Sequence, residues 1–336
     1  MSEAPPATSA PPTDPTKPEI VSDWTHGSPL VSCRFDPAGR FVFAGAQDNS
    51  VQRWDLASGA VTPLAAHESW VHALGFANHG ETLLTGGCDG QLIFWPTAAE
   101  KPAPERRIAA HQGWIRALAV SPDETLVATA GNDLVVRLWR LSDGALEREL
   151  PGHAKHVYSL MFHPSGKFLL SGDLAGAIVQ WDLAAGKELR RFDAAPLWSY
   201  NGGQAVDFGG VRTLALNPAG NRLLGGGLHE ASNPLGAVHE PLLVEFEWES
   251  GKALPTHTTK EKLKGVVWRA MYHRDGYIVA GMGGSSGGYL LFWKPDEATE
   301  FSAFKLPHLT RDLDLHADGH RLATAHFDGH LRVTRI

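Results

Sequence analysis

The sequence contains little cysteine. Only Cys33 and Cys88 occur among 336 residues. Their spacing suits neither a zinc site nor haem attachment, and Cys33 falls at an apolar core position of an expected strand. Such sparse cysteine is typical of a protein from a reducing compartment.

Long apolar runs and an excess of basic charge are also missing. No segment approaches the roughly 18 apolar residues that a membrane helix needs, and the first residues lack a basic start followed by an apolar stretch. The formal net charge is -7 and the pI is near 6.2, so the overall charge does not favour nucleic acid or anionic lipid, although local basic patches are compatible with it. We expect a soluble cytoplasmic protein with no membrane or nucleic-acid partner.

Large apolar side chains are nearly absent from residues 1–18, which hold six prolines. Such a segment cannot bury enough surface to offset the entropy lost on ordering. We expect a disordered Pro-rich tail over residues 1–18, with a solubilising role favoured over a docking motif because composition alone specifies no partner.

What the remaining sequence does contain is a repeat. Apolar segments such as VQRW and VVRLW recur at a period of roughly forty residues, which is typical of a β-propeller. Each repeat also begins with an apolar pattern and a turn like DPAG, SPDE or HPSG, where Pro, Asp and Gly favour a tight turn between strands. The segments end at Trp54, Trp95, Trp139, Trp181, Phe246, Trp293 and Thr334, and the repeats start at Leu30, Val71, Ile115, Val157, Val211, Val267 and Thr310.

Two of the segments end in the dipeptide Trp-Asp, at Trp54-Asp55 and at Trp181-Asp182. With this dipeptide and the repeat, residues 19–336 resemble the WD-repeat family. The resemblance implies one all-β domain over residues 19–336: a seven-bladed β-propeller of four-stranded antiparallel blades.

The two ends of the repeat region predict how the ring closes. The chain stops at Ile336, directly after a third-strand pattern, so the last blade lacks its outer strand. Residues 19–24 stand where an outer strand precedes each repeat, and we expect them to pair with residues 331–336. Such pairing removes an exposed sheet edge.

Two sets of residues could be mistaken for catalytic triads, because each combines a histidine, a hydroxyl and a carboxylate. The resemblance implies a structural role instead: in the family the Asp bonds the His, the His bonds the hydroxyl, and the hydroxyl bonds the indole N–H of the Trp. The sets are His67, Thr85, Asp89, Trp95 and His111, Thr129, Asp133, Trp139. Other repeats depart from the pattern, with Ala44 at the hydroxyl position, Ala175 at the Asp position, Thr334 for Trp, and Asp207 and Leu263 for His.

The spacing from Trp181 to Phe246 is longer than the others because of two insertions, residues 192–210 and 227–241. Family topology places both on one face, together with the loop GMGGSSGG. We interpret this loop as a turn, since it lacks the strand-to-helix context of a phosphate site. The pairs His229-Glu230 and His239-Glu240 lack a helical spacing and a third ligand, so we expect no metal and no cofactor.

Side chains alternate along a strand, so residues that flank the first core position of each inner strand are expected to face the central opening. Arg, Trp and Tyr dominate these positions, and they are the residue types enriched at interaction hot spots. The candidate partner-binding residues are Trp70, His72, Trp114, Arg116, His156, Tyr158, Arg212, Trp268 and Arg311, extended by Trp198 and Tyr200. The alternative is that some aromatics pack under the long loops and that arginines pair with acids such as Asp312.

The leading hypothesis is therefore a non-enzymatic scaffold that binds a peptide or protein segment, for example an acidic one, on the face bearing the long loops. One alternative is a structural subunit that packs its outer rim into a larger assembly. The other is a propeller enzyme or a binder of a small molecule or metal, using His72, His156, His229 and His239. A closed propeller needs no oligomer for stability, so we expect a monomer.

Overall fold

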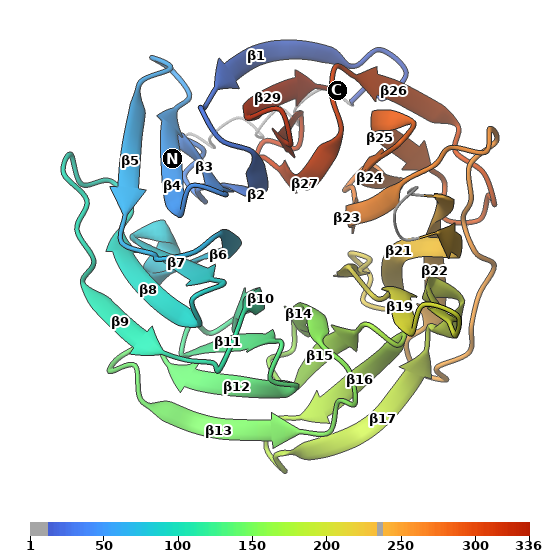
Figure 1. The fold of residues 1–336 in the computed structure, drawn as a ribbon, viewed down its shortest axis with the longest axis horizontal. Coiled ribbons are helices and arrows are strands. Elements are labelled where there is room, and N and C mark those ends of the chain that lie inside the picture. Colours follow the sequence, from blue (N-terminus) through green and yellow to red (C-terminus); the bar gives the residue numbers. More distant parts are fainter. Residues whose placement is uncertain (1–12, 234–237) are drawn as a thin grey trace, which may run out of the picture.

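The computed structural model describes residues 13–233 and 238–336, and in this part of the chain seven β-sheets stand as blades around a central channel (Figure 1). Each blade runs from an inner strand at the channel to an outer strand at the rim. Helix within the described ranges is limited to two 3-10 turns, η1 (Asn78–Gly80) and η2 (Ala195–Leu197), and no helix there is long and apolar enough to span a bilayer. The predicted seven-bladed all-β propeller is confirmed.

Blades one to four are four-stranded and antiparallel. Blade one contains β2 (Leu30–Phe35), β3 (Phe41–Ala46), β4 (Ser50–Asp55) and β5 (Val61–Ala65). Blade two contains β6 (Val71–Ala77), β7 (Thr82–Gly87), β8 (Gln91–Pro96) and β9 (Arg106–Ala109). Blade three contains β10 (Ile115–Val120), β11 (Leu126–Gly131), β12 (Val135–Arg140) and β13 (Leu146–Pro151). Blade four contains β14 (Val157–Phe162), β15 (Phe168–Asp173), β16 (Ala177–Asp182) and β17 (Lys187–Asp193).

The remaining blades contain the irregular part of the chain and the closure. A two-stranded hairpin, β18 (Trp198–Asn201) and β19 (Val206–Gly209), separates blade four from blade five. Blade five contains β20 (Thr213–Leu216), β21 (Arg222–Asn233) and β22 (Val238–Glu247). Blade six contains β23 (Val266–Tyr272), β24 (Ile278–Gly284), β25 (Gly287–Trp293) and β26 (Ser302–Leu306). Blade seven contains β27 (Thr310–Leu315), β28 (Arg321–His326), β29 (His330–Arg335) and β1 (Glu19–Thr25).

The ring closes where β1, from the start of the chain, pairs with β29 at its end. The antiparallel register runs from Glu19 opposite Arg335 to Thr25 opposite His330, with one irregularity after Ile20. Asp23 supports the pairing, because its carboxylate lies 2.6 Å from His330 Nδ1 and accepts from Arg332 Nε at 3.1 Å. The predicted closure is confirmed.

The contacts of the N-terminal segment begin before Glu19. Residues 1–12 of the expected tail lie outside the described residues. Thr13, however, donates from its hydroxyl to Asp275 at 2.8 Å and lies 2.8 Å from the Tyr277 hydroxyl, and the Ser302 hydroxyl donates to the carbonyl of Pro15 at 2.7 Å. The end of the expected tail therefore contacts blade six through Thr13 and Pro15.

The hydrophobic core is divided among the blade interfaces. Seven clusters of the described residues lie one between each pair of neighbouring blades, including the pair formed by blades seven and one. Their largest fully buried side chains are Trp54, Trp95, Trp181 and Trp293. Every blade is packed on two neighbours. Loss of one interface therefore exposes apolar surface on both of the blades that form it.

The hydrogen bonds implied by the resemblance are present in blade two. The Nε2 atom of His67 lies 2.7 Å from the Thr85 hydroxyl, which accepts from Trp95 Nε1 at 2.9 Å. The other ring nitrogen of His67 lies 3.0 Å from Asp89. In blade three, His111, Thr129, Asp133 and Trp139 repeat the set, with Arg137 added on Asp133.

Blade four also carries a complete set, which the sequence pattern did not predict. Ala175 stands at the expected Asp position, but Asp173 at the end of β15 reaches His153 Nδ1 at 2.8 Å. Ser171 completes the set by accepting from Trp181 Nε1 at 2.7 Å. The expectation that blade four lacks the Asp of the set was therefore wrong.

Blade five replaces both a strand and the polar set. Its outer position is taken by residues 253–257, which pair with β22 through two isolated bridges. Glu245 and His257 are each only 1% exposed and lie 3.1 Å apart, and the Tyr272 hydroxyl donates to Glu245. This buried network takes over the rigidifying role that His, hydroxyl and Trp have elsewhere.

Removal of β1 tests the closure. Deletion of residues 1–24 is expected to lower the melting temperature sharply, because it exposes the edge of β29 and part of the interface between blades six and seven. Deletion of residues 1–12 is the matched control and is expected to leave the melting temperature unchanged. Equal melting temperatures for both proteins in calorimetry would contradict the closure.

The polar sets predict one substitution that stabilises the protein and one that destabilises it. Trp54 Nε1 is buried and has no hydrogen-bond partner within the described residues, and Ala44 stands at the position that carries a hydroxyl in blades two to four. Ala44→Ser should therefore stabilise the protein by about 1 kcal/mol, whereas Thr85→Val should destabilise it by about 1–3 kcal/mol because it leaves buried partners unpaired. Urea unfolding measures both, and a loss of stability in Ala44→Ser would show that Trp54 needs no acceptor.

Candidate functional site

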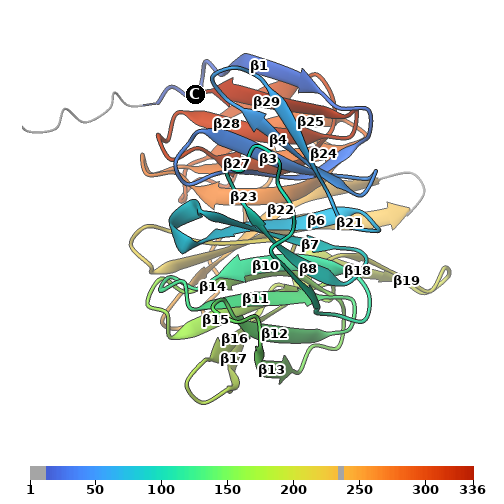
Figure 2. The ribbon, with the colours of Figure 1, turned by 90° about the vertical axis from the view of Figure 1, so that its left-hand side faces the viewer.

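One face of the ring, here called the top face, carries the long loops. The β18–β19 hairpin and the end of β21 project from it (Figure 2). The turn between β24 and β25 joins them, since Gly283 and Gly284 line the same pocket as Phe208 and Leu228. The two insertions and the Gly-rich loop therefore share one face, as expected.

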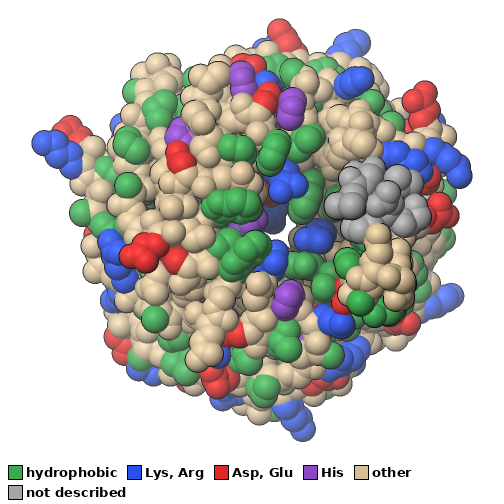
Figure 3. Space-filling view, in the orientation of Figure 1, with side chains coloured by type: hydrophobic (Ala, Val, Ile, Leu, Met, Phe, Trp, Pro, Cys, Tyr) green, Lys and Arg blue, Asp and Glu red, His purple; other side chains and the backbone are tan. Residues whose placement is uncertain are grey.

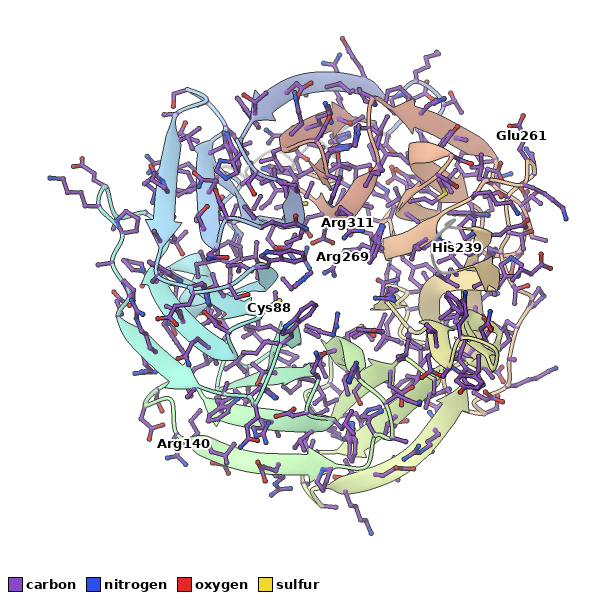
Figure 4. The ribbon with its side chains drawn as sticks, viewed as in Figure 1. Cys88, Arg140, His239, Glu261, Arg269 and Arg311 are labelled. Carbon is purple, nitrogen blue, oxygen red and sulfur yellow. The ribbon has the colours of Figure 1, made fainter. Side chains whose placement is uncertain are left out.

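The opening of the channel on the top face is lined by residues from all seven blades. A pocket of about 100 Å³ lies there, which we call the mouth pocket. Basic side chains gather in this opening between hydrophobic ones at its edge (Figure 3), and Arg269 and Arg311 project into it (Figure 4). Its lining residues are Val31, His72, Arg116, Tyr158, Arg212, Trp268, Arg269, Arg311 and Asp312.

A local irregularity of the inner strands directs these side chains. In blade three Ile115 opposes Gly131 and Ala117 opposes Ala130, so the pairing skips Arg116. A residue left out of the ladder in this way has its side chain re-aimed, which is the usual effect of a β-bulge beside a site. The same skip occurs at Val31, His72, Tyr158, Trp268 and Arg311.

Three arginines of the mouth pocket have no carboxylate partner among the described residues: Arg116, Arg212 and Arg311. They are held on aromatic faces instead. The guanidinium carbon of Arg116 lies 4.7 Å from the centres of both the Trp114 and the Tyr158 rings. That of Arg212 lies 3.9 Å from the Tyr158 ring, and that of Arg311 lies 4.5 Å from the Trp268 ring. We call these three residues the arginine triad.

The acid beside the triad is already paired. Asp312 accepts from Arg34 at 2.8 Å and from Arg269 at 2.9 Å. The alternative reading, in which Asp312 neutralises a mouth arginine, therefore applies to Arg34 and Arg269. The arginine triad keeps its charge available to a ligand.

Three residues that line the mouth pocket also carry a buried polar atom. Among the described residues, His72 Nε2, Arg212 Nε and Trp268 Nε1 are buried and have no hydrogen-bond partner. An unpaired buried polar group costs about 1–3 kcal/mol. A ligand with several acceptor oxygens would carry the opposite charge to the triad and accept hydrogen bonds from its guanidinium groups.

The field of the triad acts on the neighbouring histidine. Burial, together with Arg116, Arg311 and Arg212, lowers the pKa of His72 to about 4. His72 is therefore uncharged at neutral pH, and its ring stacks on Trp114 with centroids 6.0 Å apart. Burial and Arg116 also lower the pKa of His156.

Exposed aromatic side chains cluster around the mouth. Trp70 and Trp114 are exposed at neighbouring blades, with ring centroids 6.3 Å apart. Phe327, in the turn between β28 and β29, is also exposed, and Arg311 lies over its ring. Sequence reasoning missed Phe327 because it considered inner strands and insertions but not this short turn, where an apolar residue beside Asp328 was the available signal.

Two of the predicted residues lie away from the mouth pocket. Trp198 donates from Nε1 to Asp207 at 2.9 Å within the hairpin, and Lys155 donates to the same carboxylate at 2.7 Å, so Asp207 links the hairpin to the segment before β14 of blade four. Tyr200 is exposed on β18. His156 directly precedes β14, on the rim of the opening.

The histidines of the blade-five insertion, His229 and His239, belong to no group of three potential metal ligands among the described residues. His229 lies 4.0 Å from Glu240, whose carboxylate is occupied by Lys264 at 2.6 Å. No group of three or more potential metal ligands occurs within residues 13–233 and 238–336.

Comparison with known proteins agrees with the geometry. The profile of the family "WD domain, G-beta repeat" matches residues 19–55, 60–96, 103–140 and 144–182, which correspond to the first four repeats. The first half of this chain contains four WD repeats. Blades five to seven lie outside the matched segments and are recognised by their strands.

The chain is similar to parts of larger proteins. It is 26% identical to transcription initiation factor TFIID subunit 5 of Caenorhabditis elegans over 47% of this chain and 24% of that protein. It is 29% identical to nuclear distribution protein nudF of Aspergillus niger over 44% of this chain and 38% of that protein. Protein groucho of Drosophila melanogaster is 23% identical over 52% of this chain and 24% of its own length. The matches thus span between a quarter and two fifths of these relatives.

Titration of His72 tests the charge of the mouth. Because its pKa is lowered from 6.5 to about 4, the unfolded chain takes up a proton that the folded protein refuses, so His72 makes the protein less stable as the pH falls through that window. Arg212→Gln should raise the pKa of His72, since it removes a repelling charge. NMR titration of the ring measures the pKa, with Arg140→Gln on the rim as the control. An unshifted pKa near 6.5 in the unaltered protein would contradict the described field.

Proposed function

We propose that this protein is a non-enzymatic interaction scaffold that binds an acidic segment of a partner protein in the mouth pocket. The carboxylate or phosphate of that segment contacts the arginine triad, and the exposed aromatic residues Trp70, Trp114 and Phe327 contact the chain on either side. The observation that carries the proposal is the triad itself, three half-buried arginines that no acid of the described chain neutralises.

The distribution of charge supports binding of a single anionic group rather than of nucleic acid. The chain has a formal net charge of -7, so it lacks the broad basic surface with which proteins neutralise a phosphate backbone. The positive charge is confined to a narrow opening in a protein of opposite sign. Such an arrangement concentrates the field on a single group of a ligand.

The chemistry of the mouth supports binding over catalysis. Burial raises the pKa of the Cys88 thiol, which lies beside the opening (Figure 4), to about 12, so it is not a thiolate nucleophile at neutral pH. His72 is uncharged and stacked rather than paired with a nucleophile. The relative named as a subunit of a transcription initiation factor also fits a role in holding proteins together.

An array of synthetic peptides with Asp, Glu or phosphoserine in an otherwise neutral sequence tests this function. The variant Arg116→Gln/Arg212→Gln/Arg311→Gln should bind acidic peptides at least about tenfold more weakly, because a hydrogen bond to a charged group contributes about 1.5–3 kcal/mol. The matched control Arg40→Gln/Arg140→Gln/Arg191→Gln removes three arginines that lie outside the mouth pocket and should bind normally. Unchanged binding by the mouth variant would refute the proposal.

One observation favours a second candidate, a structural subunit that packs its rim into an assembly. The outer strands β13 and β17 belong to neighbouring blades and expose Leu146 and Leu189. Under this alternative, native mass measurement of complexes captured from the source cells would show loss of the assembly in Leu146→Gln/Leu189→Gln and its retention in the mouth variant.

A further inference from the structure

A second, larger pocket adjoins the mouth pocket on the top face. It measures about 530 Å³ and lies between the β18–β19 hairpin, the extension of β21 and β22, and the start of blade six. It shares Tyr158, Arg212, Trp268 and Arg311 with the mouth pocket. We call it the insertion pocket, because the two insertions build one of its walls.

The walls of the insertion pocket are apolar and packed in place. Phe208, Leu228 and Val266 are all buried and form a cluster of their own, separate from the seven clusters between blades, and Trp268 packs against it. Leu309, half-buried in the loop before β27, lines the pocket opposite them. A preformed apolar wall of this kind favours burial of a large apolar side chain.

Two polar side chains that line the insertion pocket, Asp207 and His239, place no unpaired charge in it. The carboxylate of Asp207 is held by Lys155 and Trp198. Burial, Arg212 and Lys264 lower the pKa of His239, which lines the pocket on the side of blade five, so this side chain is uncharged at neutral pH. The charges left at the junction of the two pockets are Arg212 and Arg311.

We propose that the insertion pocket holds a large apolar side chain, such as Leu, Met or Phe, of the same protein segment whose acidic group lies in the mouth pocket. This inference rests on the proposed function and deepens it. Because four residues line both pockets, the acidic and apolar residues of the ligand are adjacent in sequence or separated by one residue. The regular repeats then recognise the charge, and the insertions select its neighbour.

A peptide library with a fixed central Glu and random flanking positions tests the inference. The unaltered protein should enrich Leu, Ile, Met or Phe one or two positions from the Glu by about tenfold, in line with the burial of one large apolar side chain. Leu309→Gln and Leu228→Gln should abolish this enrichment and retain the preference for Glu over Gln. Leu309→Gln is the primary variant because Leu309 lies outside the core clusters, and Leu189→Gln on the rim is the matched control.

The outcomes separate this inference from the proposed function. Selection for Glu with no apolar neighbour would overturn the insertion pocket and leave the proposed function intact, and so would an apolar selection that both pocket variants retain. Loss of any preference for Glu would overturn both. Two further results would assign the pocket elsewhere and overturn the inference: binding of 4-phenylbutyrate as tightly as the best peptide, or a dimer in analytical ultracentrifugation that Leu309→Gln dissociates.

Discussion

The pairing of β1 with β29 is the constraint on which the functional face depends. The arginine triad comes from blades three, five and seven, and no two of these blades are neighbours. Their guanidinium groups keep a common orientation only while the ring is closed, because each blade is positioned by the two beside it. A closed ring also has no end blade that lacks a neighbour on one side. The geometry of the mouth is therefore a property of the whole ring rather than of any one repeat.

Closing a ring forces like charges together, and the local structure offsets that repulsion without neutralising it. Arg116 and Arg212 share the face of Tyr158, and Arg212 and Arg311 share the face of Trp268. The electron-rich faces of these rings stabilise a cation and, unlike a carboxylate, do not cancel its charge. His72 completes the arrangement by remaining uncharged. Aromatic spacers thus allow the site to exist in the free protein and still attract an anion.

The regular repeats made the fold and the mouth predictable, because alternation along an inner strand identifies the residues that face a channel. The positions of Arg116, Tyr158 and Trp268 followed from this rule. The bulge that directs them did not, since a residue left out of a ladder has no signature in a single repeat. The sequence also could not predict the partners of Asp312, which are Arg34 and Arg269 from other blades. Its neighbour in the chain, Arg311, points to the mouth instead.

The hydrogen-bond networks of the irregular segments were not predicted for a different reason. In blade four the acid is supplied by Asp173, two positions before the expected Ala175, since the strand end and the following turn can each present a carboxylate to His153. In blade five the Glu245 network has no counterpart in the repeat, so no spacing predicted it. Departures of this kind accumulate in the segment that carries both insertions, the least regular part of the ring. The regular repeats share the same hydrogen bonds and therefore offer similar surfaces. Features that distinguish one ligand from another are expected where an insertion interrupts the repeat. The insertion pocket lies at such an interruption, against an arginine triad that the regular positions supply. In the proposed function, the triad provides a general affinity for anions and the insertion pocket provides the choice of partner.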